Sequence, residues 1–253
     1  MTTVADVAAE VSRCVSYLRA STAITGDDWV RCDAIVDDRD VLTRVVEGTR
    51  QGFGTDDVAV AASLFVQAYA FRVAGVALAA YGLGLAVPDV APAATAVRLD
   101  KPRPSAVAYL RPGVSDVDAV ALVAALVDGH LRPFVDAVHG AFRVGERLLW
   151  GNVASSCATA FRALESSDAV ADPGDVRARA AAFVDAAGDV FAGLGRFTTV
   201  TVDDREGWYW DRTSCCLWYQ TSGGSLCDNC SLLERDELHR RRVAELTEAG
   251  SPA

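Results

Sequence analysis

The stretch VAVAASLFVQAYAFRVAGVALAAYGLGLAV, residues 58–87, is the long apolar run that decides the fold of this chain. Its only strongly polar residues are Gln67 and Arg72. The run is long enough to span a bilayer. However, Arg72 lies near its middle, where a charge is costly in lipid, and Ala and Gly outnumber Leu and Phe. We therefore expect a buried central helix, started by the capping residues 55–57, and no stable membrane insertion.

Helical patterns flank this run on both sides. Apolar residues recur at helical spacing in residues 4–20, 115–130 and 145–166. Asp172 and Pro173 form a start signal for another helix that reaches about residue 194. Pro133 is expected to kink or break the helix that precedes it.

Strand patterns are fewer. Residues 88–113 hold five of the chain's eight prolines and alternate apolar with polar or small residues, which predicts a small β insertion, with a plain linker as the alternative. RFTTVTVD, residues 196–203, has the β-branched content of a strand. The sequence therefore predicts a mainly α fold with a minor β component (α+β).

Composition argues against several classes of function. The 253 residues carry a formal net charge of −10, whereas binding to nucleic-acid phosphates requires clustered Lys and Arg, so we expect no nucleic-acid partner. MTTVADVAAE at the start lacks the basic residues and apolar run of a secretory signal. We expect a cytoplasmic protein with reduced thiols, and the strong preference for Arg over Lys suggests a GC-rich bacterial genome.

Four of the seven cysteines gather in TSCCLWYQTSGGSLCDNC, residues 213–230: Cys215, Cys216, Cys227 and Cys230. Clustered thiols in a reducing compartment indicate a metal, an iron–sulfur cluster or thiol redox chemistry. Structural zinc sites usually present two C-x₂₋₄-C pairs, and here one pair is directly adjacent instead. An iron–sulfur cluster is wider than one ion and accommodates divergent thiols more easily. Chemistry alone favours the cluster and leaves zinc and thiol redox open.

The pattern CC-x₁₀-C-x₂-C, preceded by RTS and followed by LWY, closely resembles the [2Fe–2S] signature of the FhuF-type siderophore-iron reductases. A second similarity to this family is LLWGNVASS, residues 148–156. The cysteine motif is specific, covers about the last fifth of the chain, and implies that Cys215, Cys216, Cys227 and Cys230 ligate the cluster.

The resemblance implies a cytosolic oxidoreductase that passes one electron from a [2Fe–2S] cluster to siderophore-bound Fe(III), usually of the hydroxamate type, and releases Fe(II). No dinucleotide or flavin fingerprint is present, so electrons must come from an external donor such as a ferredoxin or a reductase. The acidic chain leads us to expect a neutral or cationic ferric complex rather than an anionic one. Alternatives are a [2Fe–2S] electron-transfer or redox-sensing protein without its own substrate, and a zinc-stabilised binding protein.

Further residues complete the expected site. Arg143, Arg147 and Trp150 are spaced as one helical face and, with Asn152, could bind the ferric complex; a packing Trp flanked by surface arginines is the alternative. Residues 231–234, SLLE, have the form of a capping box, which would place a helix start against the cluster.

The remaining residues with ligating side chains are expected to be structural. His130, His139 and His239 are not at metal-ligand spacing, and Cys14, Cys32 and Cys157 are expected to be small buried hydrophobes; these six are assigned no role in metal binding. Two regions are predicted: a siderophore-binding body over residues 1–205, with the β insertion at 88–113, and a cluster-binding region over residues 206–253.

Overall fold

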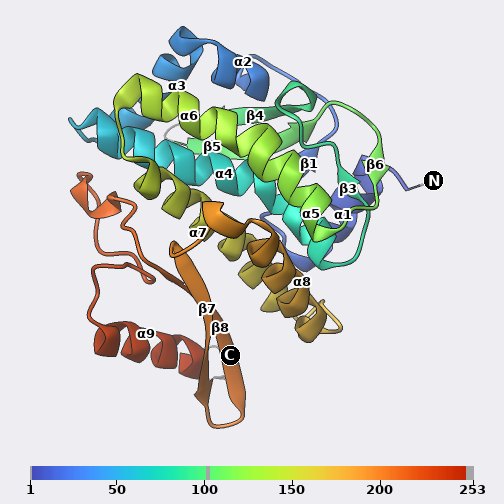
Figure 1. Ribbon diagram of the computed structural model, residues 1–253, viewed down its shortest axis with the longest axis vertical. Helices are drawn as coiled ribbons and strands as arrows, with labels where there is room; N and C mark the ends of the chain where they lie inside the picture. Colours follow the sequence, from blue (N-terminus) through green and yellow to red (C-terminus); the bar gives the residue numbers. More distant parts are fainter. Residues whose placement is uncertain (1, 101–102, 249–253) are drawn as a thin grey trace.

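The computed structural model describes residues 2–100 and 103–248 and is shown in Figure 1. The α-helices are α1 (Val4–Cys14), α2 (Cys32–Asp37), α3 (Arg39–Phe53), α4 (Val58–Gly82), α5 (Ala119–Leu122), α6 (Arg132–Phe142), α7 (Glu146–Glu165), α8 (Pro173–Ala186) and α9 (Arg235–Glu248). The strands are β1 (Ala20–Ser21), β2 (Trp29–Arg31), β3 (Val87–Pro88), β4 (Thr95–Asp100), β5 (Arg103–Tyr109), β6 (Val114–Ser115), β7 (Gly195–Val202) and β8 (Arg205–Arg212). The predicted mainly α fold with a minor β component is confirmed.

Helix α4 is the centre of the body, as the apolar run predicted. Asp57 caps its start by accepting a hydrogen bond from the Ala59 N–H at 2.8 Å. The helix packs along α7, and α3 and the sheet also contact it. By length and composition it could cross a membrane, but 67% of its most apolar window is buried inside the protein. This burial explains the run as a core helix; the absence of membrane insertion stays a prediction.

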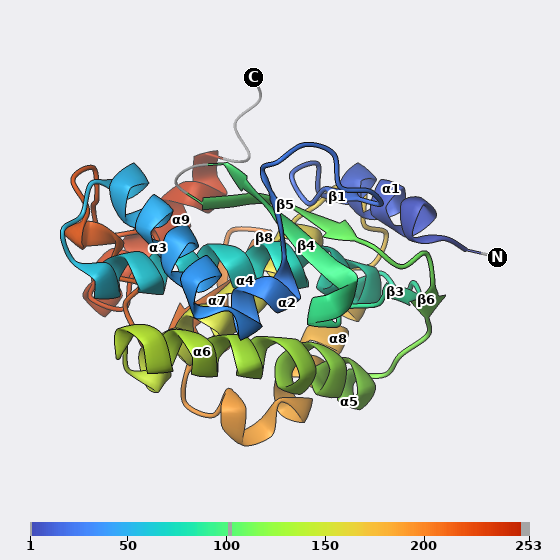
Figure 2. The same ribbon diagram turned by 90° about the horizontal axis from the view of Figure 1, so that it is seen from above.

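A four-stranded sheet in the order β1-β5-β4-β2 covers one side of α4, and α6 lies on the opposite side in Figure 2. The hairpin β4–β5 forms the middle of this sheet, so residues 88–113 do contain the predicted strands. The sheet also recruits β1, parallel to β5, and β2, antiparallel to β4, both from before α4. The β region is therefore part of the body's own sheet.

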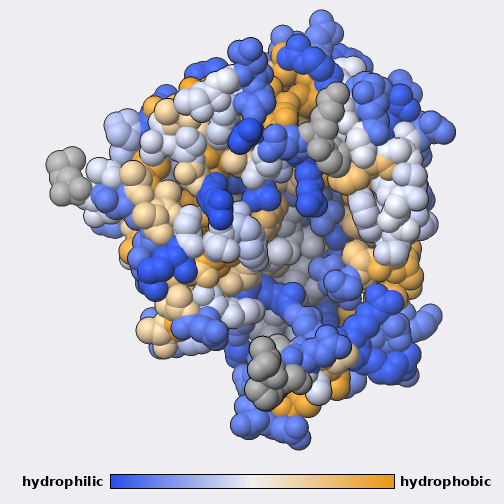
Figure 3. All heavy atoms as spheres, turned by 180° about the vertical axis from the view of Figure 1, so that it is seen from behind, coloured by the Kyte–Doolittle hydropathy of each residue, from blue (hydrophilic) through white to orange (hydrophobic). Residues whose placement is uncertain are grey.

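Figure 3 shows the face opposite to that of Figure 1, where hydrophilic side chains surround a hollow near the middle.

Two predicted helices differ in their limits. The first helix ends at Cys14, because residues 20–21 extend alongside β5. The helix before Pro133 begins at Ala119 and turns into a π-helix, η2 (Val123–Leu131), which leads directly into α6. Pro133 therefore lies at the junction of the π-helix and α6, where it cannot donate a hydrogen bond to the preceding turn.

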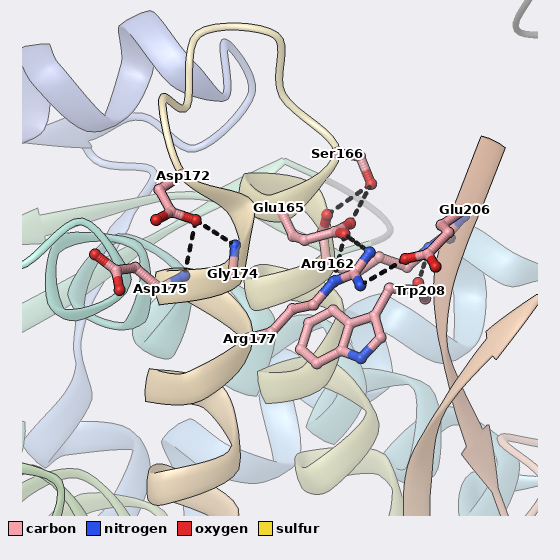
Figure 4. Close-up of polar contacts among 9 residues, drawn as sticks. All are labelled: Arg162, Glu165, Ser166, Asp172, Gly174, Asp175, Arg177, Glu206 and Trp208. Carbon is pink, nitrogen blue, oxygen red and sulfur yellow. Dashed lines mark hydrogen bonds and ion pairs between the residues drawn. The ribbon is translucent and has the colours of Figure 1, made fainter. Parts of the chain in front are cut away.

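The antiparallel hairpin β7–β8 projects from the helical body together with α9 (Figure 1). The Arg177 guanidinium on α8 joins it to the body by binding Glu165 of α7 at 2.5 Å and Glu206 of β8 at 3.1 Å (Figure 4). Arg162 of α7 also donates to the backbone oxygen of Trp208 at 3.1 Å. The expected strand at residues 196–203 is thus confirmed. The predicted boundary at residue 206 falls inside this hairpin, and the division into two regions stays a prediction.

His130 is fully buried and forms hydrogen bonds inside the core. Its Nδ1 lies 2.5 Å from the Val90 carbonyl oxygen, which can only accept, so Nδ1 carries the proton. Its Nε2 then accepts from the Tyr69 hydroxyl at 2.7 Å. Burial disfavours the charged imidazolium and lowers the pKa of His130 to about 4.

We expect this histidine to make the fold sensitive to mild acid. Because the pKa is about 4 in the folded protein and about 6.5 in the unfolded chain, protonation favours unfolding as the pH falls through this window. The free energy of unfolding should drop by about 2 kcal/mol between pH 7 and pH 5 from this group alone. Urea unfolding of the wild type and His130→Gln measures it, and an equally steep pH dependence in both would contradict the assignment.

Candidate metal centre

The four clustered cysteines meet as two pairs, and the pair Cys216 and Cys227 lies beside the first turns of α4. The Cys216 and Cys227 side chains are in hydrogen-bonding contact, and so are those of Cys215 and Cys230. Cys216 and Cys230 are buried, whereas the other two are half-buried. Within residues 2–100 and 103–248, no three or more His, Cys, Asp or Glu side chains form a group that could hold a metal ion. The cysteines are thus near one another in pairs, with all four thiols free.

The backbone turns directly after the two adjacent cysteines. Leu217 has φ 68°, a conformation that side-chain-bearing residues adopt at some cost in strain. The chain therefore turns sharply after Cys216, and the Leu217 N–H points at the Cys215 sulfur, at 3.4 Å. The Trp218 N–H likewise donates to Cys216. Peptide N–H groups aimed at sulfur stabilise thiolates and are typical of iron–sulfur sites.

The surroundings of Cys216 favour its thiolate form. The Cys227 thiol donates a hydrogen bond to it, and this contact, helped by the Trp218 N–H and the nearby Arg212 charge, lowers the pKa of Cys216 to about 6 against the cost of burial. The same contact and burial raise the pKa of Cys227. Thiolates are the form that binds iron or zinc, so one member of this pair needs little further activation.

A buried network ties the cysteine loop to the body. The Arg212 guanidinium at the end of β8 donates to the Asn152 side-chain oxygen at 2.6 Å and to the Ser214 carbonyl at 2.5 Å. Asn152 in turn donates to the hydroxyl of Ser63 at 2.8 Å, and that hydroxyl donates to the Cys216 carbonyl at 2.9 Å. Helices α7 and α4 thus fix the backbone on both sides of the cysteine pair.

The glycine before Asn152 has a steric role in the same contact. A Cβ placed on Gly151 would lie 1.8 Å from the Ser214 hydroxyl oxygen and 3.0 Å from the Ser214 Cβ. Only glycine therefore lets the segment leading into Cys215 pack this closely on α7. The WGN motif (residues 150–152) and the RTSCC motif (residues 212–216), 60 residues apart in sequence, therefore pack against each other. We call this contact the joint.

Unpaired polar atoms surround this joint. Among the described residues, three buried side-chain atoms have no hydrogen-bond partner, and all precede the cysteine pair directly: Trp210 Nε1, Arg212 Nη1 and Ser214 Oγ. Leaving a buried donor unpaired is costly. The charge of Arg212 also acts favourably on the thiolates of Cys216 and Cys227. Four thiols with unused donors and a buried cation beside them fit an anionic cluster that carries sulfide acceptors.

An open cavity of about 460 Å³ lies against one cysteine pair. Cys216 and Cys227 form part of its wall, and Trp218 stands beside them with its ring edge-on to Phe53, at 5.1 Å between ring centres. The other walls come from α3, α4, β5 and α7; they include Gln67, Phe71, Arg72, Arg103, Ser156 and Thr159. The cavity has the size of a small-molecule site and reaches the thiols directly.

The residues predicted to bind substrate do not line this cavity. Asn152 is fully buried in the network described above. Trp150 is also buried, with the Arg132 guanidinium over its ring at 5.5 Å. Arg147 is exposed and donates to the Gly193 carbonyl at 2.9 Å. Direct contact between these residues and a substrate stays a prediction. The structure shows a structural role for Asn152, in the buried network.

The expected shared face of Arg143, Arg147 and Trp150 is wrong. Arg143 is not on α7: it ends α6 in a left-handed conformation with φ 55°. The Val144 and Gly145 link then separates it from the helix that carries the other two. Helical spacing applied across this break gave a face that the chain does not form.

The expected helix start at residue 231 is also wrong. A single turn follows Cys230, with the Leu233 N–H donating to the Cys230 carbonyl at 3.2 Å, and α9 begins only at Arg235. The capping-box dipole therefore does not lie directly after the last cysteine.

Gly224 is needed for a tight loop, because a Cβ there would lie 2.0 Å from the Trp218 carbonyl oxygen.

Cys14, Cys32, Cys157 and His139 contribute to the fold. Cys14, Cys32 and Cys157 are buried in the main core, as predicted. Burial raises the pKa of Cys32 to about 11 and that of Cys157 to about 12, which keeps both protonated and unreactive. The His139 Nδ1–H donates to the Val144 carbonyl oxygen, 2.7 Å away, just beyond the end of α6.

Comparison with known families agrees with this geometry. Residues 63–187 match the family described as ferric iron reductase FhuF-like transporter. Residues 212–232, which hold all four clustered cysteines, match the FhuF 2Fe-2S C-terminal domain. No curated protein matches the chain. The two matched segments together cover more than half of the sequence and include both motifs of the joint, so the resemblance seen in the sequence is confirmed. This chain belongs to the FhuF-like ferric iron reductase family and has its [2Fe–2S] C-terminal domain.

Proposed function

We propose that this protein is a cytoplasmic ferric-siderophore reductase that reduces siderophore-bound Fe(III) by one electron and releases Fe(II). Cys215, Cys216, Cys227 and Cys230 are its cluster ligands in this proposal. Its family consists of ferric iron reductases, and the proposal adds the substrate, the ligands and the location.

One observation carries the proposal: Cys216 and Cys227 form part of the wall of the 460 Å³ cavity. A ferric complex in this cavity would lie next to the ligands of one side of the cluster. An electron carrier without a substrate needs an exposed edge for its partners but no cavity at its ligands. The geometry therefore favours a reductase that binds its own small-molecule substrate.

A [2Fe–2S] centre held by the four cysteines supplies one electron at a time. Residues of the chain bind the substrate and form its surroundings. Phe53, Phe71 and Trp218 supply apolar walls that exclude water, and Gln67 and Thr159 offer polar groups to the periphery of the ligand. Hard oxygen donors hold Fe(III) much more tightly than Fe(II), so one electron per iron suffices for release. The hydroxamate oxygens that lose the iron take up protons from water.

The function is tested by mixing anaerobic, dithionite-reduced protein with a ferric trihydroxamate complex and an Fe(II) trap. We expect cluster oxidation and trapped Fe(II) to appear together, with one iron released for each cluster oxidised, because the centre carries one electron. The comparison substrate is a small ferric chelate of similar potential that needs no binding site. Equal rates for both would make the chain an electron carrier or sensor.

A cavity variant sharpens this test. Ala68→Phe adds bulk to the cavity wall on α4 without touching the cysteines. We expect it to slow cluster oxidation by the siderophore complex while leaving oxidation by the small chelate unchanged. Ala137→Phe, on α6 and outside the cavity wall, is the matched control.

A further inference from the structure

The cavity that reaches Cys216 and Cys227 carries a charge opposite to that of the whole chain. Arg72 and Arg103 line it, and no Asp or Glu does. Neither arginine has a carboxylate oxygen within 4.0 Å among the residues that the structure describes, whereas most other arginines of the body form ion pairs. The cavity therefore carries two uncompensated cations in a protein with a net charge of −10.

Two backbone carbonyls hold the Arg72 guanidinium in place and leave some of its N–H donors unused. Its Nη1 donates to the Tyr17 carbonyl at 2.9 Å and its Nε to the Pro104 carbonyl at 3.3 Å. The cation also lies 5.4 Å from the centre of the Phe71 ring, another wall residue. These contacts fix the guanidinium but do not neutralise it, so Nη2 remains available to a ligand.

Arg103 adds to the positive potential of the cavity that Arg72 lines. It is exposed at the start of β5, and its charge repels that of Arg72, which together with burial lowers the pKa of Arg72. Arg103 also borders a neighbouring cavity lined by Asp27, Asp28 and Asp100. Asp28 and Asp100 interact with Arg98, and among the described residues no carboxylate oxygen lies within 4.0 Å of Arg103. The two arginines therefore concentrate positive potential at the cavity that adjoins the cysteines.

We propose that this cavity selects ferric complexes with net negative charge, through Arg72 and Arg103. The proposal rests on the reductase function above and names the class of its substrate: a ferric chelate whose periphery carries carboxylate or other anionic groups. It replaces the expectation of a neutral or cationic complex, because local charge at a low-dielectric cavity outweighs distant charges that salt screens. Arginine forks suit carboxylates, which they bind through two parallel hydrogen bonds.

The test varies charge while the iron ligands stay the same. A linear trihydroxamate with one terminal amine is used in three forms: free amine, acetylated and succinylated, which give cationic, neutral and anionic ferric complexes. Cluster oxidation in the reduced wild type is followed for each by stopped flow. We expect the anionic complex to react about tenfold faster than the cationic one at low salt, and the ratio to shrink as salt rises.

Variants then locate the preference. Arg103→Gln should reduce the ratio severalfold, and Arg72→Gln should do the same unless the loss of its backbone contacts disturbs the fold. Arg44→Gln is the matched control, because Arg44 is exposed and lines only the neighbouring cavity. Binding of the corresponding Ga(III) complexes, measured by calorimetry, reports the same charge order without any electron transfer.

The outcomes separate the two proposals. Fast oxidation with no dependence on ligand charge, or faster reaction of the cationic form, overturns the selectivity and leaves the reductase function standing. An Arg44→Gln effect as large as that of Arg103→Gln moves the site to the neighbouring cavity and also overturns this proposal. Oxidation by all three complexes no faster than by the small chelate overturns the function itself, and the selectivity with it.

Discussion

Replacing Cys216 or Cys227 by serine is expected to remove or strongly perturb the [2Fe–2S] centre. Wild-type protein purified without oxygen should be red-brown and contain about two irons and two acid-labile sulfides per chain. Each of these serine variants loses a thiolate from the pair that lines the cavity. We expect iron and sulfide to fall severalfold, or the EPR signal of the reduced protein to change where a serine oxygen replaces the sulfur.

Cys157→Ser is the matched control, since Cys157 is a buried core residue of α7 that contacts none of the clustered thiols. It should keep the wild-type iron content and EPR signal. The two thiol pairs add a finer expectation: variants of Cys215 and Cys230 should resemble each other, and those of Cys216 and Cys227 likewise, because the two side chains of each pair contact each other. Colourless wild-type protein with one zinc per chain would contradict the assignment of the centre.

The sequence predicts this centre well because its chemistry is local. Two short motifs contain all four thiols, Arg212 and Asn152, and the spacing of the cysteines needs no long-range contact to be recognised. The main helices are equally local, since caps such as Asp57 and Asp172 and a continuous apolar run determine them. Errors appear where helical spacing is carried across a break, as at Arg143.

The cavity could not be predicted in the same way. Its wall is assembled from Phe53 on α3, Arg103 on β5, Thr159 on α7 and the cysteine loop, so only the packed fold brings these residues together. One signal was available. Gln67 and Arg72 are the two strongly polar interruptions of the central apolar run, and both line the cavity. A polar residue in an otherwise buried helix marks the place where that helix reaches a site.

Replacing Arg212 by glutamine is expected to weaken both the fold and the cluster. Arg212 is 5% exposed and donates to Asn152 and Ser214, so its removal leaves one buried and one partly buried acceptor without this partner. Each unpaired acceptor costs about 1–3 kcal/mol. For a chain of this size, the thermal midpoint of unfolding should fall on the order of 10 °C. Arg196→Gln, an exposed arginine on the partner strand β7, should leave the midpoint within about 2 °C of the wild type.

The midpoint potential of the cluster should fall as well. Reduction adds negative charge beside Cys216 and Cys227, and the buried Arg212 cation favours that charge. Without it the reduced form is less stable, so the potential measured by dye-mediated titration moves to more negative values. A folded Arg212→Gln protein with a full cluster and an unchanged potential would rule out this electrostatic role.

Arg212→Lys separates the two effects. A lysine keeps the positive charge near the thiolates but cannot donate to Asn152 and Ser214 in the fork geometry of a guanidinium. We therefore expect a potential close to that of the wild type together with a lowered thermal midpoint. If lysine instead restores stability and leaves the potential low, the hydrogen bonds of Arg212 set the potential rather than its charge. Because Asn152 and Ser63 connect Arg212 to the Cys216 backbone, that result would place the control of the potential in the position of the cysteine loop.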